Sequence, residues 1–346
     1  MPLNVLMITG HFAPRLGGVE KHVLRVSEEL ARLGQSVTVL TRRWEPDWPQ
    51  DEDIRGIRVR RVPGGIARAP RDRQLDLLNS ADVLHCHDLY SYLRFVVPAW
   101  PGPRPPMFVT FHGYEGYPIA RIARWLRRRL AARAAGTICM GEFICRWYGH
   151  SCDHVSYGGV DAPPQRAPDP APDGPALYVG RLAPDTGVMA YLDALRLLRQ
   201  RGCDLPLVIC GDGPLRKPVL EVARDAGLRV TIEGWVGDIE PFLAGCRLAF
   251  VSGYLSILEA MAHRRLACAL YDNPLKRDYL ELFPAAQHML IADGPDSLAA
   301  AIARHIEEPR LALAKIEAAE AYAREQTWQR VASLYLDLYR RRGLPA

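Results

Sequence analysis

Residues 250–262 join an apolar strand to a helix, and a junction of this kind can bind a nucleotide. The strand breaks at Ser252-Gly253, and the helix that follows carries an early carboxylate, Glu259. Backbone N–H groups at a helix start can hold a phosphate, while a nearby carboxylate can accept both hydroxyls of a ribose. An ordinary strand–helix joint with an acid near the helix start is the alternative. Motifs elsewhere in the chain are needed to distinguish a nucleotide site from an ordinary strand–helix joint.

Two glycine-bearing loops also follow apolar strands. In the first, Gly17-Gly18 would let the backbone approach an anionic group closely, although a plain surface turn has the same composition. The second loop, Gly211-Asp-Gly-Pro214, has Arg216 where the third glycine of a dinucleotide fingerprint would lie. Neither loop has the G-x-G-x-x-G spacing, so a nicotinamide-dependent enzyme is disfavoured.

A histidine lies just past the strand expected at 108–111. This residue, His112, precedes Tyr114 and Glu115 and is placed at the edge where open parallel sheets carry their ligands. A histidine there could bond a sugar hydroxyl or a phosphate. The alternative is a structural loop histidine.

Two other clusters contain the residue types of a metal site without its arrangement. In His85-Cys-His-Asp88 the residues are consecutive at a strand end, so His85 and His87 share one face and Cys86 points away. We interpret the two histidines as lining a cleft. The acid-x-acid run Asp51-Glu-Asp53 is predicted to be solvated charge in a loop before a strand. No metal site is therefore expected.

Apolar runs alternate with amphipathic helical patterns along the whole chain, the βαβ rhythm of a parallel doubly wound sheet. The proline-rich run 161–174 interrupts the rhythm, and 346 residues exceed what one hydrophobic core usually serves. We expect two αβα domains, 1–162 and 163–326, with a final helix at about 327–346 packing back on the first. The predicted strands are 3–9, 36–40, 57–62, 83–86, 108–111 and 137–140, then 177–179, 207–210, 230–232, 248–251 and 266–270.

Composition limits the cellular setting. No apolar run has the length of a membrane span and the N-terminus lacks signal-peptide features, which predicts a cytoplasmic protein. The eight cysteines form no C-x-x-C pair, and most lie in apolar runs, so we expect reduced core thiols. The net charge is +5, and the basic excess lies in the first half.

An arginine-rich helix is predicted at 121–133. Its apolar stripe should comprise Ile119, Ile122, Leu126 and Leu130, with the arginines on the other faces. A solvated helix face is the favoured interpretation, while peripheral contact with an anionic inner membrane face is the alternative. Nucleic-acid binding is not expected, because Trp125 is the only aromatic residue among the arginines.

In their order and spacing, these features resemble retaining glycosyltransferases of family 4, which have the GT-B fold of two Rossmann-like αβα domains facing across a cleft. The resemblance runs nearly end to end. It is carried by Gly17-Gly18 with Glu20-Lys-His22, Thr110-Phe-His112, Tyr157-Gly-Gly-Val-Asp161, Tyr178-Val-Gly-Arg-Leu182, Gly211-Asp-Gly-Pro214, Glu233-Gly-Trp-Val236, Leu258-Glu-Ala-Met-Ala262 and Thr327-Trp328.

The resemblance implies transfer of a sugar from a nucleotide-diphosphate sugar to a hydroxyl acceptor with retention of anomeric configuration, and no cofactor. Arg181 would grip the diphosphate, Glu259 the ribose, and His112 would lie beside the donor sugar. The acceptor would be a saccharide, a small molecule or a lipid-linked compound. The implied donor-binding residues are Gly17, Gly18, Arg181, Thr186, Gly234, Trp235, Val236, Ser256, Ile257, Leu258 and Glu259, and the acceptor-side residues are His11, His87, Tyr114 and Glu115.

Two positions depart from the family pattern. Thr186 replaces the usual lysine of G-R-L-x-x-x-K-G, and Val251 replaces the glutamate eight positions before Glu259. One preorganised hydrogen-bond donor to developing charge is worth roughly 10²–10³ in rate, so activity either needs a substitute cation or is reduced. We predict that Lys276, one of four lysines, is that catalytic cation, a plain surface lysine being the alternative.

Two other functions fit the same residues. One is a catalytically silent partner that keeps nucleotide-sugar binding, and the other is an epimerase or phosphorylase of the GT-B type. Hydrolysis or phosphorolysis without transfer would favour the epimerase or phosphorylase, and nucleotide release with and without acceptors would separate the silent partner from a transferase.

Overall fold

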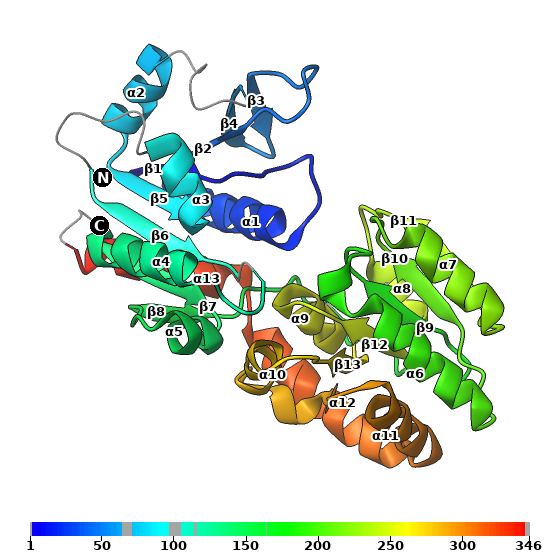
Figure 1. The fold of residues 1–346 in the computed structure, drawn as a ribbon. Coiled ribbons are helices and arrows are strands. Elements are labelled where there is room, and N and C mark those ends of the chain that lie inside the picture. The colour runs from blue at the N-terminus through cyan, green and yellow to red at the C-terminus, as the bar shows by residue number, and fades with distance from the viewer. Residues whose placement is uncertain (1, 64–70, 97–104, 114–115, 164, 343–346) are drawn as a thin grey trace. The chain divides into compact units, whose positions relative to one another are not determined.

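The computed structural model describes residues 2–63, 71–96, 105–113, 116–163 and 165–342. The chain divides by its internal contacts into two units (Figure 1). The first unit ends at Gly158 and resumes at Trp328, and the second unit runs from Gly159 to Thr327. These division points lie within a few residues of the boundaries expected from the proline-rich run and the final helix.

The first unit is built on an eight-stranded sheet in the order β3-β4-β2-β1-β5-β6-β7-β8. The chain builds one side of this sheet outward from β1 and the other side outward from β5, so the strand order reverses between β1 and β5. Open sheets bind ligands at such a switch point, beyond the carboxyl ends of the strands. The strands are β1 Asn4–Ile8, β2 Ser36–Arg42, β3 Asp51–Ile54, β4 Ile57–Val62, β5 Val83–His87, β6 Met107–Phe111, β7 Gly136–Met140 and β8 His154–Ser156.

Helices cover this sheet, and the last of them comes from the C-terminal end of the chain. Helix α13, Trp328–Arg340, packs against α1, Gly18–Arg32 (Figure 1). A buried tyrosine hydroxyl of α13 contacts a histidine of α1: Tyr335 Oη lies 2.9 Å from His22 Nε2. The other helices of the first unit are α2 Arg71–Ser80, α3 Asp88–Ser91, the π-helical turn η1 Tyr92–Val96, α4 Arg121–Arg133 and α5 Glu142–Tyr148.

The second unit has a six-stranded parallel sheet in the order β11-β10-β9-β12-β13-β14, with its switch point between β9 and β12. Its strands are β9 Ala176–Val179, β10 Leu207–Cys210, β11 Val230–Gly234, β12 Leu248–Val251, β13 Leu266–Leu270 and β14 Leu290–Ala292. Its helices are η3 Pro184–Thr186, α6 Val188–Gln200, α7 Arg216–Asp225, α8 Glu240–Gly245, α9 Tyr254–Ala262, α10 Pro274–Glu281, η4 Ala286–His288, α11 Pro295–Glu307 and α12 Pro309–Glu325. The predicted class, α/β with two doubly wound sheets, is confirmed.

Three short strands were not predicted, and one of them corrects an interpretation. Asp51 to Ile54 form β3, antiparallel to β4, whereas the sequence predicted a charged loop. Asp51 pairs with Arg60 and Glu52 with Arg61 across the two strands. Acidic residues have a low propensity for strands, so their sequence does not indicate β3. The opposite charges on the facing strand stabilise the pairing. The other two missed strands, β8 and β14, are three residues long.

The predicted apolar stripe of the arginine helix α4 holds at Leu130, which is buried, but was wrong at Ile122. Ile122 is 61% exposed, whereas Arg127 is only 2% exposed. The Arg127 guanidinium lies 4.1 Å from the centroid of the Tyr148 ring and 3.9 Å from an Asp88 carboxylate oxygen. An aromatic face and a carboxylate thus hold the charge inside the unit, and the helix is turned so that Ile122 faces solvent.

Candidate functional site

Two cations lie at the carboxyl edge of the second sheet, Arg181 on the loop after β9 and Lys276 on helix α10. Lys276 Nζ donates a hydrogen bond of 2.6 Å to the backbone oxygen of Ser252, which directly follows β12. Arg181 follows β9, the neighbouring strand, and donates to Asp185 at 2.8 Å. Asp185 also attracts the Lys276 ammonium. Arg181 and Lys276 therefore share one acidic partner at the position where an open sheet binds its ligand.

Lys276 is not a plain surface lysine. Its side chain is 8% exposed, and its ammonium lies 4.3 Å from the centroid of the Tyr279 ring. Burial lowers the pKa of Lys276 to about 8, while the charges of Asp185 and Asp272 oppose the shift. The ammonium is protonated at neutral pH and loses its proton in mildly alkaline solution.

Thr186, which replaces the usual lysine, is turned into the protein. Its hydroxyl lies 2.9 Å from the backbone oxygen of Arg181 and 2.8 Å from that of Ala183. Its side chain is buried and closes the loop that carries Arg181. Thr186 therefore offers no charge to a ligand, and the nearby cation comes from α10.

The glycines of Gly211-Asp-Gly-Pro214 shape the same loop. A Cβ atom on Gly211 would lie 1.8 Å from the backbone oxygen of Gly180, and one on Gly213 would lie 2.5 Å from that of Leu182. Gly213 also has a φ of +156°. These glycines let two backbone segments pack closely and so hold the loop that carries Arg181.

Glu259 lies in the second turn of α9, later than the sequence suggested, and is 9% exposed. At the start of α9, the Gly253 N–H donates to the Ser256 hydroxyl at 3.3 Å, and that hydroxyl donates to the Gly253 carbonyl at 2.8 Å. The Tyr254 N–H donates to the Tyr279 hydroxyl. The side chains of Ile257 and Leu258 are buried in the core, so these two residues could contribute to a donor site only through their backbone.

The residues predicted near the base lie at the end of β11. Gly234 ends this strand with a φ of +79°, a conformation that favours glycine. The indole of Trp235 is 50% exposed, which leaves a flat aromatic face available to stack on a ring. Val236, which follows, is half-buried.

In the first unit, His112 belongs to a buried hydrogen-bond network. Its Nε2 lies 2.8 Å from His87 Nδ1, and its backbone N–H donates to Asp88 Oδ1 at 2.8 Å. Burial and the nearby Arg127 charge lower the pKa of His112 to about 3. His112 is therefore a neutral hydrogen-bonding group at physiological pH.

The interpretation of both strand-end histidines as lining a cleft was wrong for His85. This residue is fully buried, and its two nitrogens lie 2.7 Å from Tyr339 Oη and 2.8 Å from Thr110 Oγ1. Helix α13 covers this strand end, so His85 is part of the core. His87 is also buried and contacts His112 instead of solvent.

The loop after β1 carries His11 and leads to Gly17-Gly18 at the start of α1. The imidazole of His11 stacks on Trp44 at 4.4 Å between ring centroids. Arg42 lies over the same indole, and burial together with the charges of Arg15 and Arg42 lowers the pKa of His11. The positive charge of this region lies beside His11, whereas the group next to Gly17 is the carboxylate of Glu20. The remaining acceptor-side residues, Tyr114 and Glu115, lie outside the described residues.

Several residues that contact these side chains could not be identified as their partners from the sequence. Ser252 holds Lys276 through its backbone oxygen, which every residue type possesses. Asp185 could have been noticed as an acid four residues after Arg181, a spacing that allows the observed ion pair. Tyr335 and Tyr339 lie on the final helix, which was expected to pack on the first domain, but their contacts with His22 and His85 were not predicted.

Comparison with known proteins identifies the family. Residues 16–162 match the model of Glycosyltransferase Family 4, and residues 175–308 match that of Glycosyl transferases group 1. The chain is 29% identical over 246 residues to a GDP-mannose-dependent alpha-mannosyltransferase of Mycolicibacterium smegmatis, which covers 61% of this chain and 64% of that protein. It is 25% identical over 244 residues to a GDP-mannose:cellobiosyl-diphosphopolyprenol alpha-mannosyltransferase of Xanthomonas oryzae, covering 63% and 64%. The chain thus spans just under two thirds of the length of these relatives.

The fold is also found in solved structures. The sucrose-phosphate synthase of Thermosynechococcus elongatus aligns with a TM-score of 0.74 at 17% identity, over 99% of each chain. Within the described part of the chain, no helix has both the length and the apolar character needed to span a bilayer. With one matched region in each half of the chain and GT-B structures as its structural neighbours, the chain belongs to the glycosyltransferases of the family 4 type.

Proposed function

We propose that this protein transfers a sugar from a nucleotide-diphosphate sugar to a hydroxyl acceptor with retention of anomeric configuration. The observation that carries the proposal is the placement of Arg181 and Lys276 around Asp185 and Ser252 at the β9/β12 switch point. A sugar diphosphate gains negative charge on its leaving group as the glycosidic bond breaks. Two cations fixed beside that group stabilise the transition state more than the ground state.

The other residues of the second unit fit the remaining parts of the donor. Glu259 accepts hydrogen bonds from the ribose hydroxyls, and the exposed indole of Trp235 stacks on the base. The capped start of α9, including the backbone near Ser256, directs N–H groups toward the phosphates.

In the first unit we assign His112 to the donor sugar. A neutral imidazole can accept a hydrogen bond from one sugar hydroxyl or donate one to it without introducing a charge. We propose that His87 positions His112, since its Nδ1 lies 2.8 Å from His112 Nε2. Gly17 and Gly18, at the start of α1, are assigned to the donor phosphate, and His11, beside the charges of Arg15 and Arg42, is assigned to the acceptor.

A screen of nucleotide sugars by thermal shift tests donor binding. GDP-mannose comes first, because two of the relatives are named for it. A donor at 100 times its dissociation constant should stabilise the fold by roughly 2.7 kcal/mol. The matching nucleoside monophosphate serves as a control and should give a smaller shift at the same concentration. A folded protein that no nucleotide sugar stabilises would contradict the proposal.

Product analysis separates the transferase from the alternatives. Nucleotide release that depends on an added acceptor, together with a glycosylated product, is expected. Donor binding without release would indicate a silent partner, whereas an altered or phosphorylated free sugar would indicate an epimerase or a phosphorylase. The acceptors to test are saccharides, small hydroxyl compounds and lipid-linked saccharides, since one relative is named for a diphosphopolyprenol acceptor.

We further propose that α4 makes peripheral contact with an anionic membrane. Ile122 and Trp125 are 61% and 51% exposed on its outer face. Arg121, Arg124, Arg128 and Arg129 surround Trp125 in one shallow depression. Exposed apolar side chains among arginines are typical of helices that lie in a lipid interface.

Charge reversal on this face should weaken vesicle binding. Arg128→Glu changes two charge units near the surface, each worth about 1 kcal/mol, so partitioning onto anionic vesicles should fall roughly tenfold or more. Lys217→Glu, at an exposed position on α7, is the matched control and should leave partitioning unchanged. Sedimentation with vesicles at two salt concentrations measures the effect. Equal binding to neutral and anionic vesicles, or none to either, would end this proposal.

A further inference from the structure

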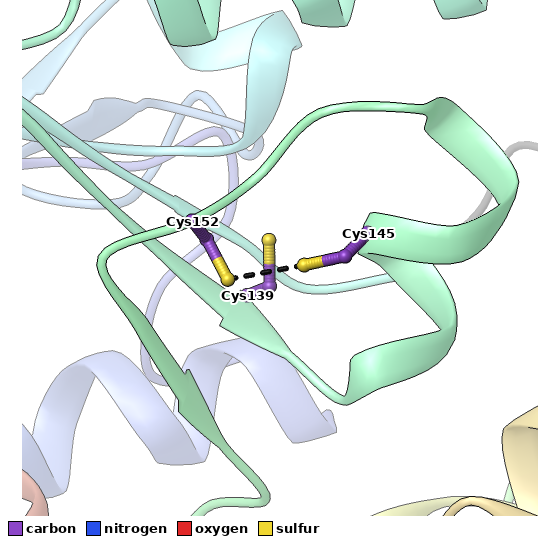
Figure 2. Close-up of side chains that lie close together, drawn as sticks. All are labelled: Cys139, Cys145 and Cys152. Carbon is purple, nitrogen blue, oxygen red and sulfur yellow. Dashed lines mark hydrogen bonds between the residues drawn. The ribbon is translucent and has the colours of Figure 1, made fainter.

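Three cysteines from separate segments of the first unit point toward one another (Figure 2). Cys139 lies near the end of β7, Cys145 on α5, and Cys152 on the connection between α5 and β8. Their three sulfur atoms lie within 4.8 Å of one another. Cys139 is a buried core thiol, as expected, whereas Cys145 and Cys152 are only half-buried, and the side chains of all three converge.

We propose that Cys139, Cys145 and Cys152, with His150 as the fourth ligand, form a structural site for a thiophilic metal ion such as zinc. Three cysteines and one histidine are an established set of ligands for structural zinc, which binds sulfur at about 2.3 Å in a tetrahedron. Sulfur atoms on such a tetrahedron are about 3.8 Å apart. Cys145 Sγ and Cys152 Sγ are 3.1 Å apart, so they need to separate by less than about 1 Å to accept the ion.

The imidazole of His150 has the hydrogen bonding of a metal ligand. Its Nδ1 lies 3.1 Å from the Ser151 carbonyl oxygen, which can only accept, so Nδ1 carries the proton. Its Nε2 is then unprotonated, and it is buried with no hydrogen-bond partner among the described residues. Metal-binding histidines commonly donate their other ring N–H to a backbone carbonyl in this way. The ligand atom of His150 does not lie within 4.8 Å of all three sulfur atoms, so the imidazole has to move toward the cluster to complete the site.

A disulfide between Cys145 and Cys152 is the competing outcome. Their separation of 3.1 Å is that of a hydrogen-bonded pair, about 1 Å longer than a sulfur–sulfur bond.

The position of the cluster indicates that a bound ion would have a structural role. Cys139 is in register with Phe111, the last residue of β6 and the neighbour of His112. The Phe111 ring also lies 5.1 Å from the His150 imidazole, between centroids. A bound ion would join β7, α5 and the connection to β8 at the edge of the sheet, beside the strand that leads to His112.

Metal analysis of the untagged protein, purified under reducing conditions without chelators, tests the proposal. About one zinc ion per chain is expected. Cys139→Ser, Cys145→Ser and Cys152→Ser should each lose it, while the matched control Cys203→Ser, a half-buried cysteine outside the cluster, should keep it. His150→Ala should weaken zinc binding roughly 10–100-fold, and the control His154→Ala should not.

A second measurement does not depend on the folding of the variants. Cobalt added to the metal-free wild-type protein should give an intense thiolate-to-cobalt charge-transfer band and a tetrahedral visible spectrum. Absence of both this band and bound zinc would overturn the proposal, as would zinc retained in all three serine variants. A Cys145–Cys152 disulfide in the reduced preparation, found by intact mass and peptide mapping, would also overturn it. Unchanged zinc affinity in His150→Ala would remove His150 as the fourth ligand.

Discussion

Replacing Lys276 by alanine should lower turnover by roughly 10²-fold or more, with a smaller effect on donor affinity. The leaving diphosphate gains charge in the transition state, and in this protein Thr186 cannot supply the cation that the family usually places after the arginine. Lys276 lies at the same edge of the sheet, held by Ser252 and attracted by Asp185. Steady-state kinetics with a saturating acceptor measure the effect.

The pH profile gives an independent signature of this lysine. The pKa of Lys276 is lowered to about 8 by burial, so its charge is present below pH 8 and is lost as the pH rises through that value. The ratio kcat/KM reports the free enzyme and should fall on the alkaline side with an apparent pKa near 8. Lys276→Arg keeps its charge throughout this range, so the alkaline decline should disappear.

Two further variants test whether the charge itself is required. Thr186 and Lys276 both adjoin Ser252: the Tyr178 hydroxyl interacts with the Thr186 and Ser252 side chains, and Lys276 bonds the Ser252 carbonyl. Thr186→Lys in the Lys276→Ala background should therefore restore part of the lost turnover. Lys315→Ala is the matched control, since Lys315 also donates to backbone oxygens in the same unit, at a different place. Wild-type turnover in Lys276→Ala would refute the role of this residue.

Glu259→Ala should weaken donor binding at least tenfold. A carboxylate that accepts hydrogen bonds from two ribose hydroxyls makes charge-assisted interactions worth about 1.5–3 kcal/mol each. Titration calorimetry with the nucleotide diphosphate alone should show most of the loss, because the interaction is with the ribose and not with the sugar.

The same calorimetric series contains its controls. Glu281→Ala removes a half-exposed carboxylate from α10 and should leave affinity unchanged. Glu259→Gln keeps the size of the side chain and removes the charge, so it should fall between wild type and alanine. A folded Glu259→Ala protein with wild-type affinity would exclude Glu259 from the donor site.

The sequence alone determined the fold class and the positions along the chain of the strands that matter for function. Alternating apolar strands and amphipathic helices have periods that reflect local geometry, so βαβ units are visible without tertiary information. The carboxyl ends of parallel strands meet at one edge of a sheet, which placed Arg181 and Lys276 together at the edge that binds ligands. The family pattern then identified which side chains at that edge to examine.

Only the tertiary structure decided which groups are partners. A hydrophobic pattern shows that a residue is buried but does not show what it contacts, as Arg127 illustrates, since an aromatic ring and a carboxylate hold its charge inside the unit. Helix α13 comes from the far end of the chain to cover His85, which no local pattern could indicate. Cys139, Cys145 and Cys152 fit no metal-binding spacing because they converge through the packing of a strand, a helix and a loop. Pairing of this kind depends on three-dimensional packing, and sequence periodicity carries no information about it.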